Sequence, residues 1–392
     1  MRHRGCNRAL AVRIVIFGLT VSSSYGNGHA TLWRGLLRAL ADRGHRVTFY
    51  ERDVPYYAAH RDLDALPDGT LRFYAAWDEV LPQARRELAD ADAALVTSYC
   101  PDGIAAAALV LDTPRVVRVF YDLDTPVTLA RLAAGQPVPY LPPEGLHAFD
   151  LVLSYTGGRA LALLRERLGA RRTAPLYGHV DPAVHRPAPP VARYHADLSY
   201  LGTYAADRQA VLERLFVGAA RAAPRRRFLI GGAQYPPAFP WTPNIHFKHH
   251  VPPAEHPAFF SSSSLTLNVT RDAMARLGHC PSGRLFEAAA CGAAIVSDDW
   301  DGLSRFFAPG EELLVARHTS DVLAALDLGQ AALATIGRRA RERTLAEHTS
   351  ACRAAELERL LEKAGETERE TEGREECGAA APRERPAGAG GA

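Results

Sequence analysis

The sequence predicts an α/β protein built from two Rossmann-like, doubly wound domains that face a cleft. Its 392 residues exceed the size at which one hydrophobic core stops growing. Short β-branched runs alternate with helical patterns in both halves, which is typical of parallel sheets covered by helices. Four prolines between residues 179 and 190 interrupt this alternation and indicate a connection between domains.

The predicted elements follow from hydrophobic periodicity. The clearest helix spans residues 31–43, where Leu32, Trp33, Leu36, Leu37 and Leu40 form one apolar stripe that ends before a glycine. Predicted strands lie at 12–17, 46–50, 93–97, 115–120, 150–154 and 173–177, then at 198–201, 227–231, 244–249, 265–269, 293–297 and 313–315. The expected organisation is an N-terminal extension (1–11), a first domain (12–178), a linker (179–197), a second domain (198–362) whose last helices return to the first, and a disordered tail (363–392).

Composition excludes several classes of function. The 46 basic and 44 acidic residues nearly cancel, which argues against a nucleic-acid partner or an anionic membrane surface. Apolar runs are too short for a membrane span, and Arg13 interrupts the stretch that would otherwise resemble a signal peptide. The six cysteines are scattered without a CxxC pair, as expected of a protein in a reducing cytoplasm.

A glycine-rich loop follows the first predicted strand. Gly26 and Gly28 allow close backbone approach, and the helix that follows offers its N-terminus to an anion. Glu51 ends the second strand about where a dinucleotide-binding acid would stand. However, Thr31 occupies the third glycine position and Gly18 lies too far from Gly28, so a dehydrogenase ranks last. A turn without a ligand remains an alternative.

A second loop and helix carry charged residues at helical spacing. Ser282 is a good N-cap for a helix over 283–291, and Gly292 is a good stop. Arg284 and Glu287 lie on one side of this helix near its positive end, where they suit a diphosphate and a pair of sugar hydroxyls. A solvated ion pair is the alternative.

The segment Arg284-Leu-Phe-Glu-Ala-Ala-Ala-Cys-Gly292 with the following apolar strand resembles the donor-binding segment of GT-B glycosyltransferases. More specifically, the chain resembles the CgeB-type glycosyltransferase-like family, named after a spore maturation protein. The resemblance covers about residues 12–350. It also rests on the motifs Phe17-Gly-Leu-Thr20, Tyr25-Gly-Asn-Gly-His-Ala-Thr31, Phe49-Tyr-Glu-Arg-Asp53, Phe120-Tyr-Asp-Leu-Asp-Thr-Pro126 and Leu267-Asn-Val-Thr-Arg271.

This resemblance implies roles for particular residues. Glu287 would hold the ribose hydroxyls of a nucleotide-sugar donor, Arg208 would meet the diphosphate, and residues 244–253 would face the nucleobase. His279 stands where many GT-B enzymes have a second glutamate, so either sugar recognition differs or catalysis is impaired. The expected donor-binding residues are Gly202, Thr203, Arg208, Arg271, Ser282, Arg284, Leu285 and Glu287. The expected residues on the acceptor side of the cleft are Gly26, Asn27, Gly28 and Asp124.

The same pattern suggests catalytic groups and no metal. His29 is the expected base or acceptor-positioning group, although a helix-start role is equally open, and Asp122 is expected behind it. Asp122 and Asp124 form a DxD sequence, which holds a divalent cation in other glycosyltransferases. In a GT-B arrangement the helix terminus and arginine would replace that metal. The histidines of the 246–250 segment do not converge on a strand.

The sequence therefore predicts a metal-independent glycosyltransferase with a nucleotide-sugar donor, an unidentified acceptor and no cofactor. Two alternatives stay open. A nucleotide-sugar epimerase would use the same helix but need more acid and base groups at the sugar. A non-catalytic nucleotide- or sugar-binding protein is favoured by His279 in place of a glutamate.

Overall fold

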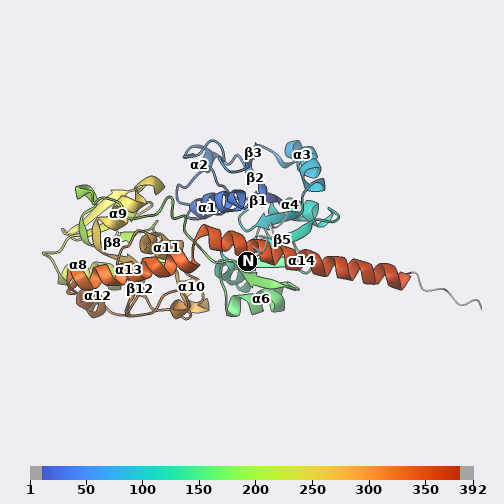
Figure 1. Cartoon of the computed structure of the whole chain (residues 1–392). Helices are drawn as coiled ribbons and strands as arrows, with labels where there is room; N and C mark the ends of the chain where they lie inside the picture. Colours follow the sequence, from blue (N-terminus) through green and yellow to red (C-terminus); the bar gives the residue numbers. More distant parts are fainter. Residues whose placement is uncertain (1–10, 380–392) are drawn as a thin grey trace, which may run out of the picture.

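A computed structural model describes residues 11–379 of the chain and shows two α/β lobes (Figure 1). The first lobe contains a seven-stranded parallel sheet in the order β3-β2-β1-β4-β5-β6-β7. Its strands are β1 (Arg13–Gly18), β2 (Arg46–Arg52), β3 (Thr70–Tyr74), β4 (Ala93–Thr97), β5 (Val117–Asp122), β6 (Leu151–Ser154) and β7 (Thr173–Pro175). Its helices are α1 (His29–Asp42), α2 (Pro55–Ala58), α3 (Trp77–Ala89), α4 (Gly103–Leu111), α5 (Thr125–Ala133) and α6 (Arg159–Leu168).

The second lobe contains a six-stranded parallel sheet in the order β10-β9-β8-β11-β12-β13. Its strands are β8 (Ala196–Leu201), β9 (Phe228–Gly232), β10 (Ile245–His249), β11 (Ser263–Asn268), β12 (Ile295–Asp298) and β13 (Leu314–Ala316). Its helices are α7 (Gln209–Leu212), α8 (Gly218–Ala222), α9 (His256–Ser261), α10 (Asp272–Leu277), α11 (Gly283–Ala290), α12 (Thr319–Leu326) and α13 (Gln330–Glu347). Two doubly wound sheets confirm the predicted fold class.

Strand order in both sheets reverses direction beside the first strand of the lobe, β1 or β8. In open parallel sheets, the crevice at such a reversal lies outside the carboxyl ends of the strands and is the usual ligand site. The loops after β1, β5, β8 and β11 therefore point toward one region between the lobes. The hydrophobic cores lie on both faces of each sheet, as the nearly unbroken burial of β4 and β9 shows.

Strand β3 was absent from the sequence prediction. It is an edge strand of five residues, and only Tyr74 in it is buried. The sequence Thr-Leu-Arg-Phe-Tyr lacks the continuous apolar run that marks a central strand, so its pairing with β2 supplies the strand character.

Helix α14 (Ser350–Ala379) leaves the second lobe and crosses back over the first (Figure 1). Its apolar residues Ala354, Leu357, Leu361 and Ala364 belong to the same core as α1. The expectation of disorder from residue 363 is therefore wrong at its start. Ala364 is only 2% exposed and packs in the core that includes α1, and the helical backbone continues to Ala379. Residues 380–392 and most of the N-terminal extension (1–10) lie outside the described residues.

The proline-rich segment between the lobes is anchored at both sides. Val180 forms a bridge with Thr349 just before α14, and Asp181 accepts a hydrogen bond from Arg38 of α1 at 2.6 Å. Among the described residues, no helix combines the length and apolar character needed to cross a bilayer.

Candidate functional site

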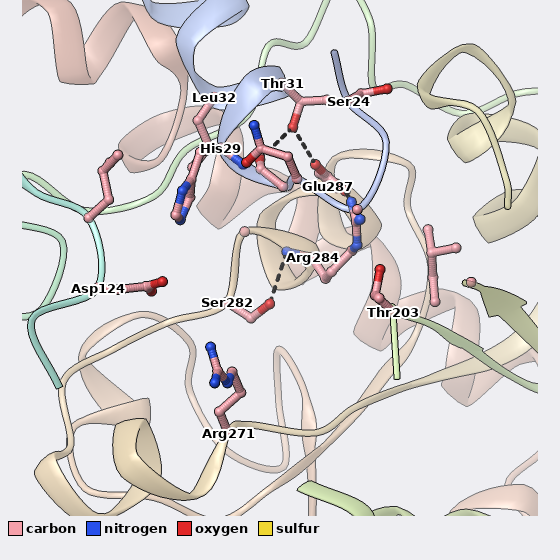
Figure 2. Close-up of a pocket in the computed structure, with 18 of the residues that line it drawn as sticks. Ser24, His29, Thr31, Leu32, Asp124, Thr203, Arg271, Ser282, Arg284 and Glu287 are labelled. Atoms are coloured by element: carbon pink, nitrogen blue, oxygen red, sulfur yellow. Dashed lines mark hydrogen bonds and ion pairs between the residues drawn. The ribbon is translucent and has the colours of Figure 1, made fainter. Parts of the chain in front are cut away.

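A cavity of about 410 Å³ lies between the two lobes (Figure 2). Its walls come from the loops after β1, β4 and β5 on one side and after β8, β9, β10 and β11 on the other, together with the start of α11. Most residues predicted from the sequence line it: Gly26, Asn27, Gly28, His29, Asp124, Gly202, Thr203, Arg208, Arg271, Ser282, Arg284 and Glu287. Asp122 and Leu285 do not.

The loop before α1 forms the upper wall on the side of the first lobe. Asn27 accepts a hydrogen bond from the backbone N–H of His29 at 3.0 Å and so helps to start the helix. The Glu51 carboxylate, 1% exposed, accepts hydrogen bonds from the Thr20 hydroxyl at 2.7 Å and the Val21 amide at 2.8 Å. Glu51 thus fixes the loop from behind and is not available to a ribose.

The two aspartates of the DxD sequence separate at the end of β5. Asp124 lines the cavity on the same side as His29 and accepts a hydrogen bond from Tyr99 Oη at 2.9 Å (Figure 2). Asp122 is fully buried, and its Oδ1 accepts hydrogen bonds from the Asp124 amide and the Thr128 hydroxyl, both at 3.1 Å. Asp122 holds the loop that carries Asp124 and does not itself line the cavity.

Arg208, at the start of the second lobe's first helical segment, has unused hydrogen-bonding capacity. Its Nη2 donates to the Thr203 carbonyl at 2.5 Å, while its buried Nε has no hydrogen-bond partner. Across residues 11–379 no carboxylate pairs with this guanidinium in the described ion pairs. A partly buried cation without an anion is costly unless a ligand supplies the charge. Arg271 differs, because Asp207 accepts a hydrogen bond from its Nε at 2.9 Å.

Helix α11 brings its N-terminus into the cavity. The Ser282 hydroxyl accepts a hydrogen bond from the Arg284 amide at 3.3 Å, which makes Ser282 the predicted N-cap. Arg284 Nη1 donates to Glu287 Oε2 at 2.5 Å. The pair is not a solvated one, because Glu287 is only 2% exposed. Leu285, expected at the donor, has no exposed surface and packs in the core of the second lobe, since it lies on the opposite helix face.

The charge of Glu287 is set by its neighbours. Burial by itself raises the pKa of this carboxyl, but Arg284 and the imidazoles of His185 and His256 outweigh burial and hold the pKa well below its usual range. Burial lowers the pKa of His185 to about 4, only partly offset by Glu287. The site therefore presents a carboxylate anion beside a guanidinium at neutral pH, with His185 uncharged.

His185, His256 and Glu287 are also the group within residues 11–379 whose donor atoms could hold a metal ion. One atom of each lies within 4.8 Å of the others. Two imidazoles and a carboxylate are ligands that zinc accepts. A zinc ion would lie about 2.0–2.2 Å from each ligand atom, so the three side chains would have to move closer together to bind it. Arg284 already occupies one oxygen of Glu287, and its positive charge opposes a second cation there.

His279 lies outside the cavity. Its carbonyl accepts a hydrogen bond from Gly157 of the first lobe at 3.0 Å, and its ring packs between two glycines. A Cβ atom at Gly158 would lie 2.5 Å from His279 Cδ2, and one at Gly302 would lie 2.5 Å from Nδ1. His279 therefore joins the two lobes, and its backbone adopts a φ of +48° to do so.

Sequence patterns missed several cavity residues. Tyr99 and His250 line the cavity with φ angles of 66° and 45°, a left-handed conformation that is unfavourable for side chains of this size. Tyr99 lies in no motif or periodic stripe, whereas His250 belongs to the 244–253 segment that was expected to face a nucleobase. Val251 and Pro253 line the cavity beside His250, at the end of the segment expected to face a nucleobase.

Residues 208–359 match a family described as glycosyl transferase-like. No curated protein matches the sequence significantly.

Solved structures of GT-B proteins are similar over nearly the whole chain. Sucrose-phosphate synthase from Thermosynechococcus elongatus aligns with a TM-score of 0.65 at 15% identity, covering 90% of this chain and 98% of the other. Anabaena HepE in complex with UDP and glucose aligns with a TM-score of 0.62 at 11% identity, covering 90% and 100%. The T4 phage protein BGT, solved with its UDP-glucose substrate, aligns with a TM-score of 0.56 at 13% identity, covering 91% and 99%. The chain therefore has the GT-B fold.

Proposed function

We propose that this protein is a glycosyltransferase that moves a sugar from a nucleotide-diphosphate sugar to an acceptor bound in the cleft. One observation carries the proposal. The unpaired guanidinium of Arg208, the N-terminus of α11 with Arg284, and the buried Glu287 carboxylate all line one cavity between two lobes. This set complements a diphosphate joined to a ribose.

The positively charged groups of the cavity can stabilise the leaving group of the proposed reaction. When the bond between sugar and diphosphate breaks, negative charge develops on the diphosphate. Arg208, Arg284 and the amides at the start of α11 are fixed where they can stabilise that charge. Removing one such donor typically slows catalysis about 10²–10³-fold. Because these groups supply the charge, we propose that the reaction needs no metal or cofactor.

Glu287 and the loop after β10 would bind the nucleoside part of the donor. A carboxylate accepts two hydrogen bonds from neighbouring hydroxyls, which matches the 2′ and 3′ positions of a ribose. Val251 and Pro253 offer an apolar surface for a base next to it. The UDP complexes of two structural neighbours support a nucleotide in this fold.

The first lobe supplies the acceptor side. His29 and Asp124 both line the cavity from the first lobe, and we propose His29 as the base that takes a proton from the acceptor hydroxyl (Figure 2). Asp122 supports Asp124 from behind. The proposal extends to a CgeB-type enzyme, because the order and spacing of the sequence motifs resemble that family, and to the cytoplasm, because the six cysteines are scattered without a CxxC pair.

A non-catalytic binding protein is the second candidate. The position of the second glutamate of many GT-B enzymes is His279, which contacts Gly157 and Gly158 instead of the cavity. Donor binding through Arg208 and Glu287 would remain in such a protein, whereas sugar transfer would not.

Incubation with a panel of nucleotide sugars, with water and simple sugars as acceptors, tests the proposal. A transferase releases nucleoside diphosphate, and Arg208→Ala should reduce that release by about 10²–10³-fold. Arg221→Ala, an exposed residue on α8, is the matched control and should be unaffected. An epimerase would convert the nucleotide sugar without releasing nucleoside diphosphate. A panel in which every donor binds but none is consumed would support the binding protein instead.

A further inference from the structure

Glu287 is the point where four separate segments of the chain meet. Thr31 of α1 donates a hydrogen bond to its Oε1 at 3.4 Å, and Arg284 of its own helix donates to Oε2. His185 from the linker places Nε2 3.9 Å from Oε1, and His256 at the start of α9 places Nδ1 3.5 Å from Oε2. The function proposed above uses Glu287 and Arg284 and leaves both histidines unexplained.

The hydrogen bonding of His256 determines what it offers to Glu287. Its Nε2 lies 3.1 Å from the Val251 carbonyl, and a carbonyl only accepts, so Nε2 carries a proton. The other ring nitrogen, Nδ1, faces the Glu287 carboxylate. His256 is only 3% exposed, so its ring meets this carboxylate away from bulk water. His256 thereby links the loop at Val251 to the carboxylate.

His185 connects the linker to the same carboxylate. Its side chain is 4% exposed, and neither ring nitrogen has a hydrogen-bond partner in the described structure. The turn that carries it is fixed, because the His185 amide donates to the Asp181 carbonyl at 2.9 Å while Arg38 of the first lobe holds the Asp181 carboxylate. The polar neighbours of the imidazole are the Glu287 carboxylate and the His256 ring, and a neutral His185 can donate a hydrogen bond from Nε2 toward the carboxylate.

We propose that His185 and His256 are positioning residues for the donor nucleotide. They fix the Glu287 carboxylate for the ribose hydroxyls, and through His185 the interdomain linker is part of the donor site. This inference rests on the proposed function, since it assumes that Glu287 receives a ribose. The linker then does more than join two lobes. Together with α1 and α9, it holds in place the Glu287 carboxylate that binds the nucleotide.

The difference in affinity between a ribonucleotide and an analogue without ribose hydroxyls distinguishes a positioning role of the two histidines from a purely structural one. The probe is whichever of UDP, GDP, ADP and CDP binds tightest, compared with its 2′,3′-dideoxy analogue by titration calorimetry. We expect the wild-type protein to prefer the ribonucleotide at least about tenfold, the scale of a hydrogen bond to a charged group. Glu287→Gln should remove most of this preference while binding of the dideoxy analogue changes little.

Matched variants test each histidine. His185→Leu and His256→Phe should reduce the ribose preference several-fold or more. His185→Gln keeps an N–H donor near the Nε2 position and His256→Asn keeps one near Nδ1, so both should retain most of the preference. His147→Leu changes an exposed histidine of the first lobe and should leave the preference at the wild-type value.

The outcomes are distinguishable. If Glu287→Gln loses the ribose preference but all four variants of His185 and His256 keep it, the positioning role is overturned while the donor site stands. If affinity falls equally for both ligands, the histidines are structural only and the inference fails. Stoichiometric binding of Zn²⁺ by the wild-type protein, lost in His185→Leu, would assign the cluster to a metal instead. A wild-type protein that binds none of the four diphosphates contradicts the proposed function itself.

Discussion

At the scale of single residues, the pKa values of two buried carboxyl groups near the cleft are shifted in opposite directions. Glu287 faces Arg284 and two imidazoles, which keep its pKa well below the usual range despite burial. Asp122 has no cationic neighbour, and burial raises its pKa to about 6, although hydrogen bonds from Thr128 and Asp124 oppose the rise. One carboxyl is thus prepared to accept hydrogen bonds from a ligand, whereas the other holds a loop.

Asp122 makes stability depend on pH. Its pKa is about 6 in the folded protein and 3.8 as an ordinary aspartate, so the folded state binds the proton more tightly. The stability that Asp122 contributes is present below pH 3.8 and is lost as the pH rises through 6, in total about 2–3 kcal/mol. About half of that loss falls between pH 5 and pH 7.5.

Urea unfolding of wild type and Asp122→Asn at pH 5 and pH 7.5 measures this contribution. The variant carries no titratable group there, so its stability should fall about 1 kcal/mol less than that of the wild type between the two pH values. Asp112→Asn, at an exposed position after α4, controls for loss of a surface charge. Identical pH dependence in wild type and Asp122→Asn would show that this carboxyl is already ionised in the folded protein.

At the scale of elements, α11 and α14 show what a sequence pattern can and cannot settle. Ser282 and Gly292 predicted the bounds of α11 because capping is local. The pattern also suggested a solvated Arg284–Glu287 face, which the packing of the linker and α9 around Glu287 overrides. For α14, the charged composition after residue 362 suggested disorder. A local pattern cannot show that the start of this segment packs on α1, which lies more than 300 residues earlier in the sequence.

The attachment of α14 to the first lobe depends on a few apolar side chains. Leu357 has no exposed surface and packs in the core that includes α1. Leu357→Ala should lower the free energy of unfolding by about 2–5 kcal/mol, because it leaves a cavity in that core. Arg359→Ala, two residues away and exposed, should change it by less than about 0.5 kcal/mol. Equal effects in denaturant titrations would mean that α14 does not pack on α1.

At the scale of the whole molecule, the sequence predicted both sheets except for strand β3. Most of the site residues it predicted line the cavity, because parallel strands bring the loops at their carboxyl ends to one edge. It did not predict the convergence of the linker's His185 with His256, or the role of His279 between Gly158 and Gly302. Those contacts join segments from both lobes, and no local periodicity encodes them. Tyr99 was missed for a related reason, since its left-handed backbone is imposed by the fold.

The central claim is that the cavity between the lobes binds a nucleoside diphosphate. A thermal-shift screen with UDP, GDP, ADP and CDP tests it without knowledge of the sugar or the acceptor. A ligand at 100 times its Kd adds about 2.7 kcal/mol of stability, which should raise the Tm by about 3 °C for one of the four. Arg208→Ala and Glu287→Ala should abolish the shift, while Arg221→Ala should preserve it. A protein whose Tm responds to none of the four, or whose shift persists in both cavity variants, would contradict the account.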